Sequence, residues 1–196
     1  MSYHFNESLK EGVLPKKLTH LTTGYHFNQI INENVLPNTI THLIFNFNYD
    51  QIINENVLPN SLTHLSFGYK YNQPINENVL PKSLTHLTFG NNYNQIINKN
   101  VLPESLIHLK FGYDFNQIIN NILPNSLTHL FFGYRYSHLI NNLPNSLLEL
   151  DLSYCCFYKE IIDLDLLPES LVLLTIHKRI TVIGTVPTKL IIKYRW

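Results

Sequence analysis

The sequence LPNSLTHLSFGYKYNQPINENV, from Leu58 to Val79, is one of several near-copies of a unit that fills most of the chain. Each copy is marked by a proline that follows Leu or Val. These prolines are Pro15, Pro37, Pro59, Pro81, Pro103, Pro124, Pro144, Pro168 and Pro187, and they lie 19 to 24 residues apart, most often 22. A period in this range is typical of repeat proteins, in which each unit buries its apolar side only against its neighbours.

The apolar residues of the unit predict one short strand per repeat, and we expect each coil to bury about six side chains, here Leu58, Leu62, Leu65, Phe67, Tyr71 and Ile75. Leu62, Leu65 and Phe67 form an L-x-x-L-x-F pattern whose last part alternates apolar and polar residues, as in a strand with one buried face. Gly68 then ends the strand, and the return path NQPINENVLP is rich in Asn, Ile and Val and stops at proline, which disfavours helix. The unit predicts a β-rich solenoid with a parallel sheet on one face, little helix, and a return path of extended chain and tight turns or a short second strand.

Composition agrees with this class and excludes several others. The 196 residues include 25 Asn and no Ala, only 14% are charged, and the net charge is zero. Alanine is the best helix former, and a helical protein rarely lacks it. Disordered chains usually carry a larger fraction of charged residues. The neutral balance gives no attraction to nucleic acid or to an anionic membrane, and no apolar run is long enough to span a bilayer. We therefore expect no nucleic acid and no membrane among the partners.

Two features favour an intracellular setting. The N-terminus MSYHFNESLK lacks the apolar core of a secretory signal, and the two cysteines, Cys155 and Cys156, are adjacent rather than spaced as a disulfide framework. Free thiols persist in reducing compartments. We expect an intracellular, cytoplasmic protein.

The return path carries a family resemblance. The segment YNQPI at residues 71–75 is close to the Phe-Asn-x-Pro-Ile signature of the FNIP repeat, a 22-residue variant of the leucine-rich repeat, and residues 27–31 and 115–119 carry Ile in place of Pro. The chain thus resembles the FNIP-repeat proteins of social amoebae and of large DNA viruses of protists. The resemblance implies a right-handed leucine-rich-repeat superhelix that serves as a protein-interaction scaffold, in the host cytoplasm if the protein is viral.

The repeats divide the chain into three predicted parts. Residues 1–13 match the second half of a unit, residues 14–142 hold six near-identical repeats, and residues 143–196 hold degenerate repeats. The last part has six acidic residues and one lysine over 149–169, then five basic residues and no acid over 170–196. We expect this end either to cap the open core of the solenoid or to mediate a homodimer by exchange between subunits.

The repeat places one histidine in each strand, and a parallel sheet would stack the copies about 4.8 Å apart. The row comprises His20, His42, His64, His86, His108 and His129. Because each alternates with core leucines, we expect it to point outward from the sheet. We interpret the row as a copied surface residue, with pH sensing and metal binding as alternatives. No Cys, Asp or Glu lies beside it to complete a closed zinc site, so no metal and no cofactor are predicted.

Asparagine forms three further rows, to which we assign a structural role. They are Asn28, Asn72, Asn94 and Asn116, joined by Asp50; Asn32, Asn54, Asn76, Asn98, Asn120 and Asn141; and Asn34, Asn56, Asn78 and Asn100. An Asn side chain can donate and accept along a stack and can also close turns. We expect alanine at Asn76 and its stack neighbours to lower stability through lost turn bonds.

The remaining rows suggest a core and a partner-binding face. One aromatic row keeps its type in every repeat and is assigned to the core, whereas an offset row that includes Tyr69, Tyr113 and Tyr134 tolerates Asn91 and is assigned to a partly exposed rim. The outward position after the core leucine varies widely between repeats, through drift or through selection for a partner. The candidate binding face comprises the six histidines with Ser66, Thr88, Lys110, Phe131, Tyr69, Tyr113 and Tyr134.

No catalytic constellation is visible, because the acids are scattered and no carboxylate orients a histidine beside Ser or Thr. A phosphate-binding glycine loop is also missing. We therefore predict a non-catalytic leucine-rich-repeat scaffold for protein–protein interaction, with an unknown protein partner. The alternative is a structural or self-assembling, virion-associated element without a dedicated heteropartner.

Overall fold

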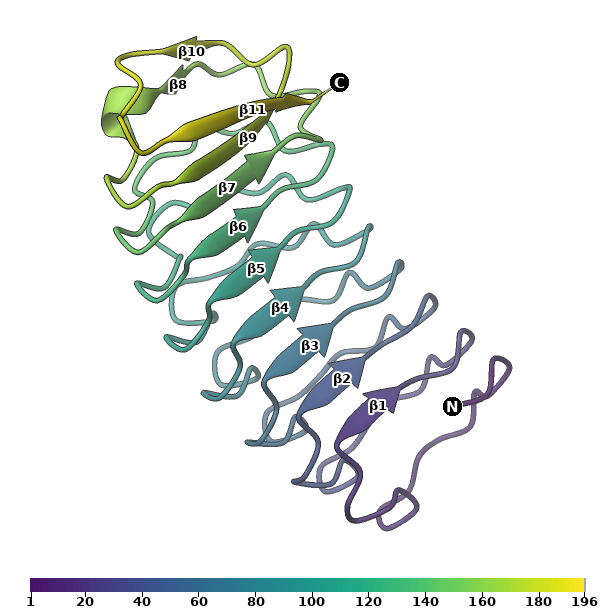
Figure 1. Cartoon of the computed structure of the whole chain (residues 1–196). Helices are drawn as coiled ribbons and strands as arrows, with labels where there is room; N and C mark the ends of the chain where they lie inside the picture. Colours follow the sequence, from purple (N-terminus) through teal and green to yellow (C-terminus); the bar gives the residue numbers. More distant parts are fainter. Residues whose placement is uncertain (196) are drawn as a thin grey trace.

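Each L-x-x-L-x-F segment forms a short strand, and the strands align side by side in one parallel sheet that runs the length of the molecule (Figure 1). The computed structural model describes residues 1–195. The sheet contains β1 (His20–Thr22), β2 (His42–Ile44), β3 (His64–Ser66), β4 (His86–Thr88), β5 (His108–Lys110), β6 (His129–Phe131), β7 (Glu149–Leu152), β9 (Leu173–His177) and β11 (Ile191–Arg195), in that order. The predicted β-rich solenoid with little helix is confirmed.

The register of the sheet places each residue beside its own copy. His42 pairs with His20 on one side and His64 on the other, and the core leucines and the variable residues pair in the same way. Neighbouring coils are therefore nearly superimposable, so a residue that the sequence copies becomes a continuous row in space.

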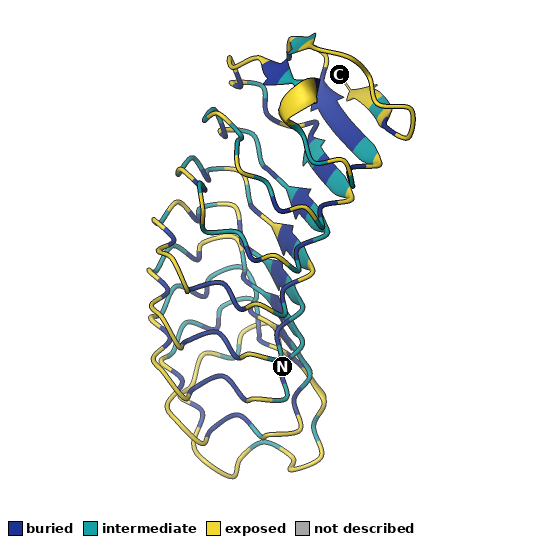
Figure 2. Ribbon diagram, turned by 90° about the vertical axis from the view of Figure 1, so that its left-hand side faces the viewer, coloured by how far each residue is buried: buried dark blue, intermediate teal, exposed yellow. Residues whose placement is uncertain are grey.

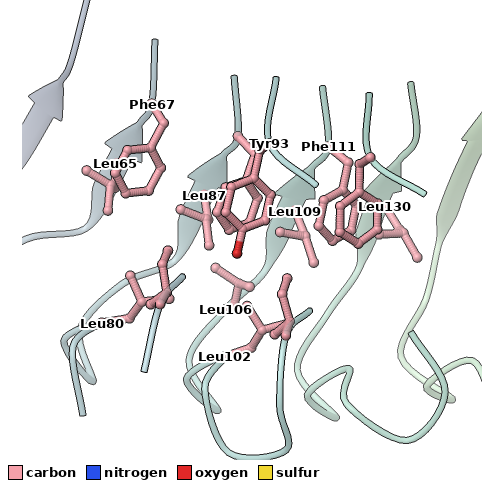
Figure 3. Close-up of a cluster of buried hydrophobic side chains, with 14 of the residues drawn as sticks. Leu65, Phe67, Leu80, Leu87, Tyr93, Leu102, Leu106, Leu109, Phe111 and Leu130 are labelled. Carbon is pink, nitrogen blue, oxygen red and sulfur yellow. The ribbon is translucent and has the colours of Figure 1, made fainter. Parts of the chain in front are cut away.

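The core is a stack of equal layers enclosed by the coils. All six apolar positions expected from the unit are buried: Leu58, Leu62, Leu65, Phe67, Tyr71 and Ile75, and the valine before the Leu-Pro pair is buried as well. Figure 3 shows leucine and aromatic side chains of successive coils meeting in the interior, and Figure 2 shows exposed residues gathered on the turns. A single coil could not bury these groups, so stability comes from contact between neighbours.

The coils fan apart from the strand side toward the opposite side. Equivalent rings lie 4.1 Å apart for His42 and His64 on the sheet surface, 5.7 Å for Phe45 and Phe67 beneath it, and 6.2 Å for Tyr49 and Tyr71 deeper in the core. The solenoid therefore curves, and the sheet with its histidines lines the concave face.

A glycine lies shortly after β1, β3, β4, β5 and β6, where neighbouring backbones approach closely, and Asn46 takes this position after β2. A Cβ added at Gly90 would lie 1.6 Å from the carbonyl oxygen of Gly68, and one at Gly112 would lie 2.0 Å from that of Gly90. No side chain fits at these distances. The turn glycine therefore sets how tightly the coils stack at this corner.

The C-terminal part extends the solenoid within its own chain. Strands β9 and β11 continue the sheet, while β8 (Ile162–Asp163) and β10 (Val182–Ile183) pair on another side of the coils, next to the short 3₁₀ helix η1 (Leu164–Leu166). Within residues 1–195, the outer edge of β11 pairs with no strand. The three-part division and the homodimer stay predictions. Within residues 1–195, no helix has the length and apolar character needed to cross a membrane.

Candidate protein-interaction face

The six histidines form one stacked row on the concave face, which we call the histidine row. Neighbouring rings lie 4.0 to 4.3 Å apart with interplanar angles of 11 to 14°. His20 is exposed and the other five are half-buried. The leucine that follows each histidine is buried, so the rings point away from the core as the alternation predicts.

A threonine before most of these histidines holds the ring in place. The Oγ1 atoms of Thr41, Thr63, Thr85 and Thr128 lie 2.7 to 2.9 Å from Nδ1 of the following histidine. The same four hydroxyls lie 3.1 to 3.2 Å from a backbone carbonyl oxygen of the preceding coil. Each threonine therefore ties its histidine to the neighbouring coil, and this partner was missed in the sequence because threonine also has a high strand propensity.

Partial burial lowers the pKa of the central histidines, and the neighbouring rings of the row add to this effect. Partial burial is the main cause for His64, His86 and His108, and the charge that neighbouring rings would carry lowers the pKa further. These three rings are therefore neutral at neutral pH. Residues 1–195 hold no group of three or more His, Cys, Asp or Glu side chains placed to share a metal ion.

The variable positions form a second row beside the histidine row, which we call the variable row. Ile44 and Lys110 are exposed, and Ser66, Thr88 and Phe131 are half-buried. Two shallow grooves lie between the rows. One of about 270 Å³ is lined by residues of β2 to β4, and one of about 250 Å³ by residues of β4 to β6, including Lys110 and Phe131. The structure thus brings Ser66, Thr88, Lys110 and Phe131 together with the histidines.

The tyrosine rim lies at the corner after the strands, away from the grooves. Tyr69 and Tyr113 are 44% and 43% exposed, and Tyr134 is half-buried. Tyr113 stacks on Tyr134 at 4.7 Å, and Tyr134 meets the ring of Phe157 edge-on at 5.2 Å. With Arg135 these residues border a hollow of about 690 Å³. Phe157 was missed in the sequence because its repeat has lost the FNIP pattern.

The first asparagine row is a hydrogen-bonded ladder. The Oδ1 atom of each member accepts from a backbone N–H one coil further on, at 2.9 Å from Asn72 to Asn94 and 2.8 Å from Asn94 to Asn116. Asp50 takes the same role with one carboxylate oxygen, which accepts from the backbone of Asn72. A glutamine amide of the next coil donates to the same oxygen at most steps.

The other two asparagine rows differ from the expectation. Asn32, Asn54, Asn76 and Asn98 are exposed, and within residues 1–195 their side chains make no hydrogen bond, so the expected side-chain turn bonds do not form there. Asn120 is half-buried, and its Oδ1 has no hydrogen-bond partner. The third row has another function: Asn34, Asn56, Asn78 and Asn100 adopt φ of 61 to 68°, in the left-handed region that asparagine tolerates better than most residues.

The family model of the FNIP repeat matches residues 5–48, 47–92, 93–135 and 120–155. These matches cover most of the chain, and the protein belongs to the FNIP-repeat family. The resemblance inferred from residues 71–75 is confirmed.

Two solved structures are similar to this chain. One is described as the crystal structure of CroV588, a novel circular LRR protein structure; it is 54% identical with a TM-score of 0.91, over 97% of this chain and 29% of that one. The other is YopM from Yersinia enterocolitica WA-314, 24% identical with a TM-score of 0.54, over 91% of this chain and 42% of that one. The likeness to YopM shows the fold alone, and the chain spans less than half the length of either structure. None of the curated proteins matches the chain.

Proposed function

We propose that the protein is a non-catalytic scaffold that binds another protein on its concave face. The observation that carries this proposal is the contrast between the two rows on that face. The histidine row is uniform through β6, whereas the variable row beside it changes from Ser66 to Thr88, Lys110 and Phe131 between coils of almost identical backbone. Packing does not dictate these side chains, so they are free to match a partner.

The chemistry of the concave face suits a protein partner. The grooves between the rows place the exposed Ile44 and the half-buried Phe131 beside hydroxyl groups, imidazoles and one ammonium group. Mixed apolar and polar surface of this kind is typical of protein interfaces, and the tyrosines of the rim add area at a low entropic cost. The fold that the chain shares with leucine-rich-repeat structures supports the same reading.

Affinity capture from an extract of the source cells tests this proposal. A face variant with Ser66→Arg and Thr88→Arg is compared with the wild type and with a back variant, Glu33→Gln and Glu77→Gln, whose substituted residues are exposed away from the sheet. We expect the face variant to lose proteins that the wild type and the back variant both retain. If all three capture the same proteins, the concave face is not the binding site.

A second candidate function, a self-assembling structural element, is favoured by the side opposite the sheet. Isoleucines that stand in place of the signature proline are exposed there: Ile30, Ile52, Ile96 and Ile118 are 39 to 66% exposed, and Pro74 is exposed at the same position of the coil between Ile52 and Ile96. Exposed apolar surface of this kind is typical of association sites. Light scattering should then show a concentration-dependent mass that falls in the variant Ile96→Lys with Ile118→Lys. A monomeric wild type at all concentrations contradicts this function.

The predicted homodimer through the C-terminal part needs a separate test. The outer edge of β11, where Ile191 is 56% exposed, is the contact that a second chain could extend. Proline at Ile192 would remove a backbone N–H from this strand. We expect Ile192→Pro, but not the isoleucine-row variant, to abolish a dimer formed at this end.

A further inference from the structure

Four threonines of the concave face favour one nitrogen of the following histidine as the carrier of the ring proton. The Oγ1 of Thr63 has one hydrogen, and it donates this hydrogen to the carbonyl oxygen of Thr41 at 3.1 Å. Where the hydroxyl donates to this carbonyl, Oγ1 accepts at the 2.9 Å contact with His64, and Nδ1 of His64 is the donor. A neutral imidazole with hydrogen on Nδ1 has a bare lone pair on Nε2. The ring of His64 thus presents a hydrogen-bond acceptor.

The same geometry recurs along the row. Thr41, Thr85 and Thr128 each donate to a carbonyl of the preceding coil and each contact Nδ1 of the next histidine. Four histidines therefore share this tautomer: His42, His64, His86 and His129. The histidine row then carries four Nε2 lone pairs in a line, and a row of acceptors is matched by a partner segment that supplies donors.

Two carboxylates on β7 lie next to the β6 end of the histidine row. Register places Glu149 next to His129 and Asp151 next to Phe131. The Nε2 of His129 lies 3.8 Å from a carboxylate oxygen of Glu149, too far for a hydrogen bond. Two acceptors therefore lie side by side, and one cationic donor placed between them could bond both.

We propose that the concave face binds a basic, donor-rich segment of a partner protein, with a Lys or Arg side chain seated between His129 and Glu149. This inference rests on the proposed protein-binding function and specifies the chemistry of the partner. The charged groups of the two rows are Lys110 on β5, Glu149 and Asp151 on β7, and Lys193 on β11, two strands beyond β7. The carboxylates are nearest to the end of the histidine row, so this end attracts cations.

Acid weakens such a complex. Protonation at Nε2 turns each acceptor into a cationic donor and places like charges on rings about 4 Å apart. The carboxylates of Glu149 and Asp151 oppose this repulsion only at one end of the row. We therefore expect binding of a basic segment to fall as the histidines become protonated.

The chain contains its own control for the tautomer. Ile107 replaces threonine before His108, so this ring has no hydroxyl partner at Nδ1 although it stacks between the same neighbours. Nitrogen chemical shifts of the full chain at pH 7.5 separate protonated from bare imidazole nitrogens. We expect a bare Nε2 in His64 and His86 and a mixture of tautomers in His108. The variant Thr85→Val should give His86 the mixed signature of His108, and a protonated Nε2 in wild-type His64 would overturn the proposal.

Binding is tested with two octapeptides, one alternating Arg and Ser and one alternating Glu and Ser, by calorimetry at low salt with the full chain. We expect the Arg-Ser peptide to bind and to shift the Nε2 signal of His129, and the Glu-Ser peptide to do neither. An exposed charge pair is worth about 1 kcal/mol, so Glu149→Gln should weaken binding about five-fold. The matched control Glu77→Gln, an exposed acid on the back of the coil, should leave binding unchanged.

Besides the tautomer result, three binding results would reject this inference: no binding of the Arg-Ser peptide, preference for the Glu-Ser peptide, or equal binding by the Glu149→Gln and Glu77→Gln variants. Its failure is distinguishable from failure of the proposed function. If the face variant still loses captured proteins while the Arg-Ser peptide does not bind, the concave face is a protein-binding site of another chemistry. If capture is also unchanged, the face binds no protein.

Discussion

At the scale of single residues, the core contains polar atoms that nothing in the described chain satisfies. The hydroxyl groups of Tyr49, Tyr71, Tyr93 and Tyr136 are buried and have no hydrogen-bond partner within residues 1–195. Burial raises the pKa of all four phenols well above the usual value. The same position holds Phe27 and Phe115 in other coils, so the ring and not the hydroxyl is what packing requires.

Phenylalanine at Tyr71 should therefore be tolerated or favourable. Removing an unsatisfied buried hydroxyl relieves a desolvation cost of about 1 kcal/mol, and the ring keeps its contacts with Phe67 and Tyr93. We expect Tyr71→Phe to match or exceed the wild type in the free energy of unfolding, measured with urea. A clear loss of stability would show that the hydroxyl has a partner after all, such as a bound water.

The asparagines of one turn offer a second test at this scale. Asn78 has φ of 63°, whereas Asn76 is exposed and its side chain makes no hydrogen bond within the described chain. Alanine in the left-handed region costs about 1–2 kcal/mol, and glycine avoids this steric penalty. We expect Asn78→Ala to destabilise the protein by about 1 kcal/mol, Asn78→Gly by less, and Asn76→Ala hardly at all. Equal loss from the two alanine variants would contradict the assignment.

At the scale of elements, the strands are short and owe their order to their neighbours. Strands β1 to β6 have only three residues each. Strand β1 pairs with β2 alone, whereas β2 to β6 each join two partners, and every one of these strands supports one layer of core. The histidine row is a property of the sheet, because no single strand contains more than one of its rings.

This row should make stability depend on pH. Because the folded-state pKa values of His64, His86 and His108 are lowered from 6.5, the unfolded chain binds more protons once the pH falls below about neutral. We expect the melting temperature to fall as the pH decreases from 7.5 to 5.5. The triple variant with Gln at these positions should show a smaller decrease, while His4→Gln, outside the row, should behave as the wild type. An identical decrease in all three proteins would rule out the row as its source.

At the scale of the whole molecule, the protein is nearly one-dimensional. Each coil contacts the coils before and after it, so a defect in the middle divides the stack, whereas a defect at the end removes little. Leu87 lies in the central strand β4 and is fully buried, and Leu21 is its equivalent in the terminal strand β1.

Alanine at these two positions should separate the roles of centre and end. Removing a buried leucine side chain costs about 2–5 kcal/mol. We expect Leu87→Ala to lower the midpoint of urea unfolding and to broaden the transition, because the two halves no longer unfold together. Leu21→Ala should fray the first coil and leave the main transition close to that of the wild type. Equal shifts for both variants would indicate a globally cooperative core instead.

The sequence by itself determined the class of fold, the core and the family. A period of 22 residues, an L-x-x-L-x-F strand and a terminating glycine predict a stack that buries the same positions in every coil, and Leu62, Leu65, Phe67, Tyr71 and Ile75 are all buried as expected. Stacking makes this prediction dependable, since each copy of the repeat experiences the same surroundings as the next.

Only the tertiary structure decided what the exposed rows do. Asn72, Asn76 and Asn78 look alike in the sequence, but the first bonds the next coil, the second faces solvent and the third takes a left-handed turn. The tautomer of the histidine rings likewise depends on a contact between coils. It is set by whether the hydroxyl of the preceding threonine donates its hydrogen to a backbone carbonyl of the coil before it. These properties arise from contacts between residues about one repeat apart, which the spacing of residue types within a single repeat does not encode.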